Sequence, residues 1–424
     1  MPNNSLHNPP SSYLPLYLAV IFSLSIVMGL QVISIPWLAV DYLALSPRFV
    51  GLIQAAVLLP NILLIVGGMA ADRGLLVNRF LMLLIIYAVI HSVLLILLSQ
   101  YWLSIIWLLT YALLLGCVGA FVQPGKDYIL GSLAGSNLQS TIAKNQCCQY
   151  LGQAVGIGIA SKLYVWNVNL LPLSQIGFTL LAVFLFYFFN KIHALSTLGA
   201  SINAVHNKNT DAKSSLNFVS LMVSGVQFCW DSIVLRSLLF VVIVNGFFHI
   251  GVFIVALPVL VKTVYFGDIG LYALLQCLFI LGTVSTTVIV MVKGQLDAPG
   301  RRVIFSLLYA GLILLGLSAG PTTYGLFFLV FLWGVVVGIS ATLGRAILQS
   351  QVSSQYRGRA ISIYQFALFG FAPLGSLFAG IAIEYWNVLF VLKISAIMSF
   401  IAFAALFFTR PLWDIEAEDT QSTR

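Results

Sequence analysis

The chain has 424 residues, of which 60% are hydrophobic and only 8% are charged, and its mean hydropathy is +1.03. A soluble domain does not have such a composition, so we expect a membrane protein with many spanning segments. The net charge of +8 comes with no basic patch interleaved with aromatic residues. We interpret it as a mark of topology and of contact with anionic lipid headgroups, not of nucleic-acid binding.

Long apolar stretches predict twelve spanning helices. A hydrocarbon layer about 30 Å thick requires roughly 20 apolar residues per helix, and backbone groups in lipid must hydrogen-bond within their own segment. The predicted spans of the first half are residues 14–42, 48–71, 79–99, 101–132, 139–165 and 169–190. Those of the second half are residues 237–262, 267–292, 302–319, 323–350, 358–386 and 388–409.

Lys and Arg indicate which helix ends face the cytoplasm, because positive side chains favour the inner ends. With a cytoplasmic amino terminus, most basic residues fall on or near the inner face, and both termini are then cytoplasmic. The exceptions are Arg48, Lys162, Lys262 and Lys393.

A polar stretch in the middle of the chain gives the predicted domain division. An N-terminal six-helix bundle covers residues 1–190, a cytoplasmic linker 191–236, a C-terminal six-helix bundle 237–409 and a polar tail 410–424. Apolar residues between Leu216 and Leu235 favour an amphipathic helix within the linker. The alternative is that they begin span seven.

Landmark residues of the first half recur in the same order in the second half. At an offset of about 222, Gly29, Pro36 and Gln54 recur as Gly251, Pro258 and Gln276; at about 219, Gly125-Lys126 recurs as Gly344-Arg345 and Gly156 as Gly375. Duplicated bundles of apolar helices are a transporter architecture. We therefore expect an all-α membrane fold of two pseudo-symmetric six-helix bundles.

Several motifs resemble the major facilitator superfamily. Gly68-Met-Ala-Ala-Asp72-Arg73 is similar to the start of its signature loop, and Asp297-Ala-Pro-Gly300-Arg301-Arg302 to the end of it. Four other stretches resemble the branch of this superfamily that holds drug:proton antiporters, macrolide efflux proteins and the enterobactin exporter. They are Phe121-Val-Gln-Pro124, Gly225-Val-Gln-Phe, Ala346-Ile-Leu-Gln349 and Arg357-Gly358-Arg359. The resemblance covers about residues 16–408 and implies the twelve-helix major facilitator fold.

Charged residues near helix ends are candidates for gating or coupling. Asp72 can approach Arg73, Arg79 or the positive start of span eleven, near Arg357 and Arg359, and the resemblance implies that such contacts bias the equilibrium between inward-open and outward-open states. A static loop salt bridge is the alternative. The charged tail of the second loop, Asp297, Arg301 and Arg302, either gates or anchors the topology.

Two acidic residues lie near the predicted outer ends. Asp41, at the end of span one, is a candidate for coupling or gating, and the alternative is a solvated rim position. Glu384, near the end of span eleven, has the same two interpretations, with Lys393 as its expected partner.

Lys126, Asp127 and Arg345 lie just inside the inner ends of spans four and ten, and the two cations are repeat equivalents. Ionisable groups within spans usually face the bundle interior or pair with a partner. The pattern predicts attraction of an anionic substrate or an inner gate. The alternative is that the long side chains reach lipid phosphates.

Uncharged polar residues within the spans are candidates for lining a central cavity. Asn245 and His249 stand four apart and are expected on one face of span seven, and a histidine there can titrate near neutral pH. The remaining candidates are Gln31, Gln149, Gln153, Tyr364 and Gln365. Hydrogen bonding between helices is the alternative for all of them.

The resemblance implies a monomeric transporter in a bacterial inner membrane that exports an amphipathic small molecule, such as a drug or a siderophore, in exchange for protons. Uptake of an anionic metabolite or siderophore is the alternative, and a non-transporting receptor is the alternative of another class. An enzyme is not indicated, because the five histidines are scattered and no nucleotide-binding Gly-x-x-x-x-Gly-Lys-Ser/Thr motif occurs. We expect no cofactor and no metal site.

Overall fold

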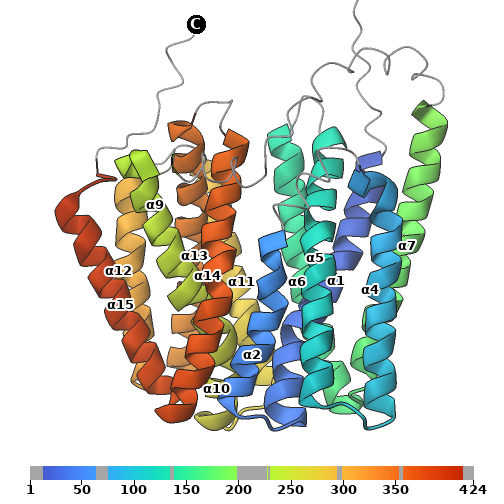
Figure 1. Cartoon of the computed structure of the whole chain (residues 1–424), viewed down its shortest axis with the longest axis horizontal. Helices are drawn as coiled ribbons and strands as arrows, with labels where there is room; N and C mark the ends of the chain where they lie inside the picture. The colour runs from blue at the N-terminus through green and yellow to red at the C-terminus, as the bar shows by residue number, and fades with distance from the viewer. Residues whose placement is uncertain are drawn as a thin grey trace, which may run out of the picture. The chain divides into compact units, whose positions relative to one another are not determined.

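The computed structural model describes residues 13–63, 75–133, 138–197, 227, 230–293, 298–352 and 357–413. These residues form helices joined by short connections, and no strand occurs among them (Figure 1). Most of the predicted linker helix and the tail after residue 413 lie outside them, while Ile233 and Leu235, the last apolar residues of that predicted helix, belong to the helix Ile233–Val244 of span seven. The predicted all-α membrane fold is confirmed.

Each predicted span corresponds to a helix. In the first half these are α1 (Tyr13–Trp37) with its continuation η1 (Leu38–Tyr42), α2 (Pro47–Leu58) with η2 (Leu59–Leu63), α4 (Leu75–Ser99), α5 (Ile105–Leu133), α6 (Leu138–Trp166) and α7 (Leu170–Thr197). In the second half, α9 (Ile233–Val244), η4 (Asn245–Gly251) and α10 (Val252–Thr263) form one continuous span; α11 (Ile269–Lys293), α12 (Pro299–Ser318), α13 (Thr323–Gln351), α14 (Arg357–Tyr385) and α15 (Val388–Thr409) follow.

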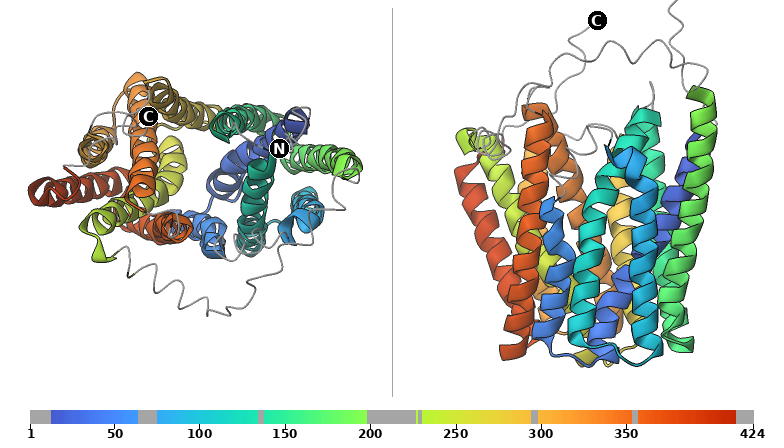
Figure 2. Two further views of the ribbon diagram at one scale, coloured as in Figure 1. Left: turned by 90° about the horizontal axis from the view of Figure 1, so that it is seen from above. Right: turned by 45° about the vertical axis from the view of Figure 1, so that its right-hand side comes forward.

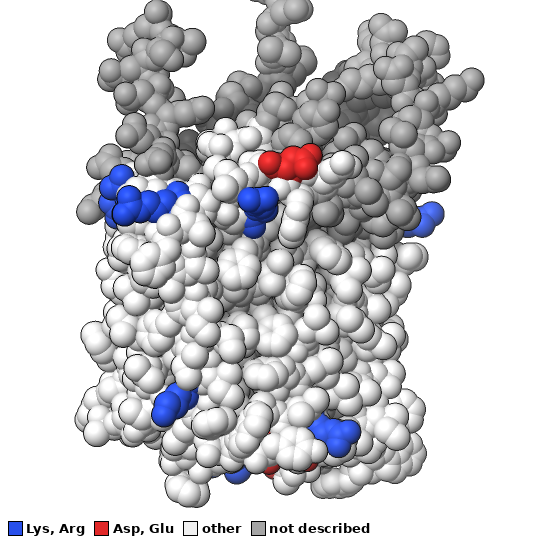
Figure 3. Space-filling view, turned by 60° about the vertical axis from the view of Figure 1, so that its left-hand side comes forward, with Lys and Arg blue, Asp and Glu red and all other residues white. Residues whose placement is uncertain are grey.

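The length and composition of these helices suit a membrane. In the part of the chain that the structure describes, 10 helices are long and apolar enough to cross one, and Pro47–Leu63 is a shorter apolar helix. The remaining helix, α6, is equally long but carries Gln146, Gln149 and Gln153. On the face shown in Figure 3, Lys and Arg lie toward the helix ends and leave an uncharged belt between them.

The helices pack as two compact units. The first unit comprises the described parts of Met1–Val32, Leu63–Leu103 and Cys117–Leu216; the second comprises those of Ile33–Ile62, Ser104–Gly116 and Asn217–Arg424. Within the first unit α4 and α7 lie side by side, and within the second α12 lies beside α15 and α11 beside α13 (Figure 2). The end of α1, η1 and α2 thus belong to the second unit, where α2 packs against α14. The division into two bundles at the linker stays a prediction.

Repeat-related glycines make the same contact in each unit. In the first unit, a Cβ on Gly156 of α6 would lie 2.1 Å from the carbonyl oxygen of Ile26 and 3.0 Å from the Cα of Gly29 on α1. In the second unit, a Cβ on Gly251 would lie 2.7 Å from the Cα of Gly375 on α14. Spans one and five therefore touch backbone to backbone as spans seven and eleven do, which is the relationship that the sequence repeat predicts.

Candidate functional site

A hydrogen-bonded triad lies at Gln31 in the first unit. The hydroxyl of Tyr87 donates to Gln31 Oε1 at 2.9 Å, and Gln31 Nε2 lies 3.3 Å from His91 Nε2. Because Tyr87 fixes the amide oxygen, the amide N–H of Gln31 donates to the imidazole. Tyr87 and His91 are buried one turn apart on α4, with ring centroids 4.9 Å apart. Sequence analysis did not select them, although their spacing of four residues within one span was a usable signal.

Lys126 is a buried cation in α5. Its side chain is only 4% exposed, and among the described residues no hydrogen bond or ion pair to its ammonium is seen. The charge of Asp127 acts on it, while the Asp127 carboxylate accepts hydrogen bonds from Gln123 Nε2 at 3.2 and 3.3 Å. The backbone carbonyl of Lys126 accepts a hydrogen bond from Tyr17 at 2.6 Å. Ionisable groups within spans usually face the bundle interior or pair with a partner, so this cation is a candidate for attracting an anion.

Three predicted residues, Arg345, Tyr364 and Gln365, come together in the second unit. They line a pocket of about 130 Å³ between α13 and α14, together with Gln349 and two apolar residues. The guanidinium is exposed and acts electrostatically on the Tyr364 hydroxyl, and Gln365 Oε1 is buried without a described partner. The pocket therefore offers a cation, a phenol and an amide to a small polar or anionic group.

Asn245 and His249 contact different helices. Asn245 Nδ2 donates to Ser340 Oγ of α13 at 2.8 Å, whereas His249 Nε2 lies 3.0 Å from Ser399 Oγ of α15. Both residues belong to the π-helical η4, whose wider turn changes the angle between positions four apart. Asn245 and His249 therefore hydrogen-bond to separate neighbouring helices, and their place in a cavity stays a prediction.

Asp41 and Lys262 form an ion pair within the second unit. Asp41 lies in η1 and is 27% exposed, and Lys262 lies in the last turn of α10 and is 44% exposed. One turn before Asp41, the ring of Trp37 stacks on Tyr272 of α11 with centroids 5.6 Å apart, and both rings are buried. The structure thus joins the end of span one to spans seven and eight. Sequence analysis noted Lys262 only as an exception to the charge rule, and that misfit was the signal for its role.

A second set of contacts joins α2 to α14 at the same helix ends. Glu384 Oε2 accepts hydrogen bonds from the Ser46 hydroxyl at 2.7 Å and from the Arg48 backbone N–H at 3.1 Å. The expected pairing of Glu384 with Lys393 is therefore wrong, since its described partners come from the start of α2. A Cβ on Gly51 would lie 2.5 Å from the carbonyl oxygen of Ser376, so α2 and α14 touch at their backbones.

The other predicted gating residues are only partly described. Asp72, Arg73 and Asp297 lie outside the described residues, as do the side chains of Arg357 and Arg359 at the start of α14. Arg79 and Arg302 are exposed. Arg301 Nε donates to the Trp413 carbonyl oxygen at 3.1 Å, and its guanidinium lies 5.1 Å from the centre of the Trp413 ring. Gln149 and Gln153 are half-buried on α6.

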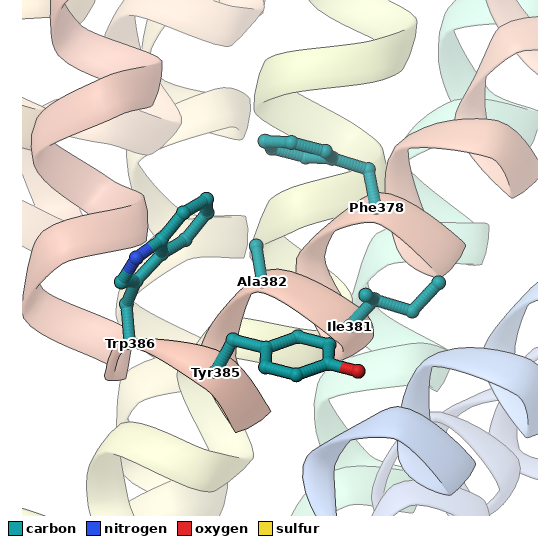
Figure 4. A pocket seen from close by; sticks show the side chains of 5 residues that line it. All are labelled: Phe378, Ile381, Ala382, Tyr385 and Trp386. Atoms are coloured by element: carbon teal, nitrogen blue, oxygen red, sulfur yellow. The ribbon is translucent and has the colours of Figure 1, made fainter.

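An apolar hollow lies at the end of α14. It measures about 540 Å³, and Figure 4 shows its lining of Phe378, Ile381, Ala382, Tyr385 and Trp386. Tyr385 and Trp386 are exposed at the helix end, where amphipathic rings anchor a helix at a membrane interface. This hollow was not predicted from the sequence, since a run of apolar and aromatic residues reads equally as lipid-facing helix.

Comparison with known proteins identifies the family of this chain. The sequence model of a family described as "Transmembrane secretion effector" matches residues 12–424. No curated protein matches the chain in sequence.

Several solved structures have a similar fold. The nucleoside transporter NupG has a TM-score of 0.67 at 12% identity over 95% of this chain and 99% of that one. A POT family transporter in complex with a thioalcohol conjugated peptide has 0.70 at 13% identity over 95% and 96%. A bacterial homolog of the human lysosomal transporter Spinster has 0.65 at 14% identity over 96% and 98%.

Proposed function

This chain belongs to the transmembrane secretion effector family of the major facilitator superfamily, and we propose that it exports an amphipathic small molecule by alternating access in exchange for protons. Membership makes it a multi-pass membrane transporter of a small-molecule substrate. The family's description as a secretion effector favours export. We further propose that it lies in a bacterial inner membrane with both termini in the cytoplasm.

The observation that carries the mechanism is the joining of spans one and two to spans seven and eleven within one compact unit. Asp41 pairs with Lys262, Glu384 binds the start of α2, and Gly51 lies against α14. With cytoplasmic termini these contacts lie at the outer ends of the helices, so they would close the pathway to the outside. A partly exposed ion pair contributes about 0 to 1 kcal/mol, so such a gate can open and close at little cost.

The cations of each unit favour a substrate with an anionic group on an amphipathic body. Lys126 is a buried ammonium with no hydrogen-bonded partner described, and Arg345 lines a small polar pocket. A carboxylate or sulfonate would stabilise either charge, and a siderophore or an acidic drug carries such a group. Import of an anionic metabolite uses the same cations, so the direction of flux separates the two functions.

The test is flux through the purified protein in proteoliposomes under an imposed pH gradient. The probes are taurocholate, an amphipathic sulfonate that stays ionised, the neutral amphiphile digoxin, the cation ethidium and a carboxylate siderophore. We expect taurocholate or the siderophore to leave loaded vesicles when the outside is acidified. Binding without flux would instead identify a receptor, and accumulation driven by an acidic outside would identify an importer.

A further inference from the structure

We propose that His249 is the residue that takes up the coupling proton, at its Nδ1 atom. The proposal rests on the proton-coupled transport proposed above and names its site. His249 lies near the middle of the span formed by α9, η4 and α10, and its side chain is 2% exposed. A titratable side chain at that depth is a functional-site candidate in a membrane protein.

The hydrogen bonds around His249 determine which ring nitrogen is free. Ser399 Oγ lies 3.0 Å from His249 Nε2, and the same hydroxyl donates to the Ser395 carbonyl oxygen at 2.9 Å. A hydroxyl has one proton to donate, so Ser399 accepts from His249 Nε2–H. The neutral ring therefore carries its proton on Nε2, and Nδ1 presents a lone pair.

That lone pair is buried and has no hydrogen-bond partner among the described residues. His249 Nδ1 and the indole Nε1 of Trp333 are both buried polar atoms without a described partner. Trp333 lies in α13, is 2% exposed, and has its ring centroid 6.3 Å from that of His249 at an angle of 79°. Two neighbouring rings thus each carry an unpaired polar atom, an acceptor on His249 and a donor on Trp333, and leaving either unsatisfied costs about 1 to 3 kcal/mol.

The surroundings of His249 disfavour the charged form of its ring in this packing, because a buried charge without a partner is costly. The helical elements that contact η4 or Trp333 are α9, α10, α11, α13, α14 and α15. The titratable or charged side chains described on them, none with a described contact to the ring, are Arg236, Lys262, Tyr272, Cys277, Tyr324, Arg345, Tyr364, Glu384, Tyr385 and Lys393.

Proton uptake at Nδ1 would make the present packing unfavourable. The imidazolium would add a second N–H without a described acceptor and place an uncompensated charge beside the ring of Trp333, which itself packs against Phe253 with ring centroids 4.8 Å apart. The packing described here therefore belongs to the neutral ring. Water on one side of the membrane supplies the proton and water on the other side receives it, so proton uptake and release need no other reactant.

The span that carries His249 connects it to the ion pair at the helix end. η4 continues without interruption into α10, which carries Lys262. π-helical turns are frequent at functional sites and absorb local rearrangement. A shift of η4 away from Trp333 would therefore move Lys262 relative to Asp41 and weaken the closed arrangement.

A spectroscopic titration tests proton uptake without any substrate. Protonated imidazole quenches a neighbouring indole, so tryptophan fluorescence of the reconstituted wild-type protein should fall through one acid transition. That transition should be absent from His249→Gln and from Trp333→Phe, and present in His91→Gln. The proposal is overturned if His249→Gln keeps the transition or if His91→Gln alone removes it.

A flux experiment tests coupling with the probe taurocholate. We expect His249→Gln to reduce pH-driven efflux at least tenfold while taurocholate exchange at equal pH stays within twofold of wild type. Equal loss of both, with thermal unfolding unchanged, would make His249 a substrate contact and overturn the proposal. If the wild type moves no probe under a pH gradient yet shows the fluorescence transition, the proposed function fails while the proton site stands.

Discussion

Asp41 and Lys262 form an ion pair that joins the end of η1 to the last turn of α10. The two residues lie about 221 positions apart, so they occupy nearly equivalent places in spans one and seven of the duplicated chain. With both termini in the cytoplasm, as proposed, Lys262 is an exception to the rule that places cations at cytoplasmic helix ends. Its pairing with Asp41 accounts for the exception, because the cation serves a contact between spans.

Removal of either charge should favour opening of this end. We expect Asp41→Asn and Lys262→Gln each to raise the rate at which a cysteine at Val40 is labelled by a polar maleimide, by up to about fivefold, since an exposed pair contributes about 0 to 1 kcal/mol. The background lacks the native cysteines. The charge-swapped double variant, Asp41→Lys with Lys262→Asp, should return the rate toward the wild-type value.

Lys393→Gln is the matched control, because Lys393 is an exposed lysine of α15 with no ion pair among the described residues. It should leave the labelling rate unchanged. An unchanged rate in the Asp41 and Lys262 variants as well would show that the pair does not hold this end closed.

The glycines at the helix contacts should be far less tolerant than their neighbours. Gly156→Ala places a Cβ 2.1 Å from the Ile26 carbonyl oxygen, whereas Gly158→Ala on the same helix meets nothing within 4 Å. We expect the first to lower the free energy of unfolding by about 1 to 3 kcal/mol, and the second to be neutral or slightly stabilising. Thermal unfolding in detergent measures both, and equal melting temperatures would contradict the close contact of α1 and α6.

These glycines also show what the sequence could predict. Gly29, Gly156, Gly251 and Gly375 were identified by their repeated spacing, and spacing is sufficient because close backbone approach requires the absence of a side chain. The twelve helices were predicted for a similar reason, since the membrane fixes both the length and the apolar character of a span.

The polar contacts could not be predicted in the same way. Whether Asn245 and His249 face a cavity or neighbouring helices depends on a π-helical turn, and no local sequence signal specifies that turn. The partners of Asp41 and Glu384 come from distant segments, so they depend on how the spans pack. Charge type alone suggested Lys393 as the partner of Glu384, whereas in the structure Glu384 accepts hydrogen bonds from Ser46 and from the backbone of Arg48.

The hydroxyl of Tyr87 should stabilise the first unit by holding the side-chain amide of Gln31 in one orientation. Tyr87→Phe removes the hydrogen bond to Gln31 Oε1, and we expect a loss of about 1 kcal/mol in stability. Tyr101→Phe is the matched control, because Tyr101 is 85% exposed. A thermal unfolding experiment compares the two variants, and an equal effect would mean that the triad with His91 adds nothing to the stability of the first unit.

Lys126 should show opposite effects on stability and on transport. Lys126→Met removes a buried ammonium that lacks a hydrogen-bonded partner among the described residues, so we expect a higher melting temperature. The same change removes the charge that attracts an anion, so taurocholate flux should fall at least tenfold, which corresponds to about 1.4 kcal/mol of binding, while digoxin flux, if present in the wild type, should stay unchanged. Lys144→Met, at an exposed position of α6, should alter neither property. If Lys126→Met lowers the melting temperature and leaves taurocholate flux intact, the ammonium is a structural group and not the anion site.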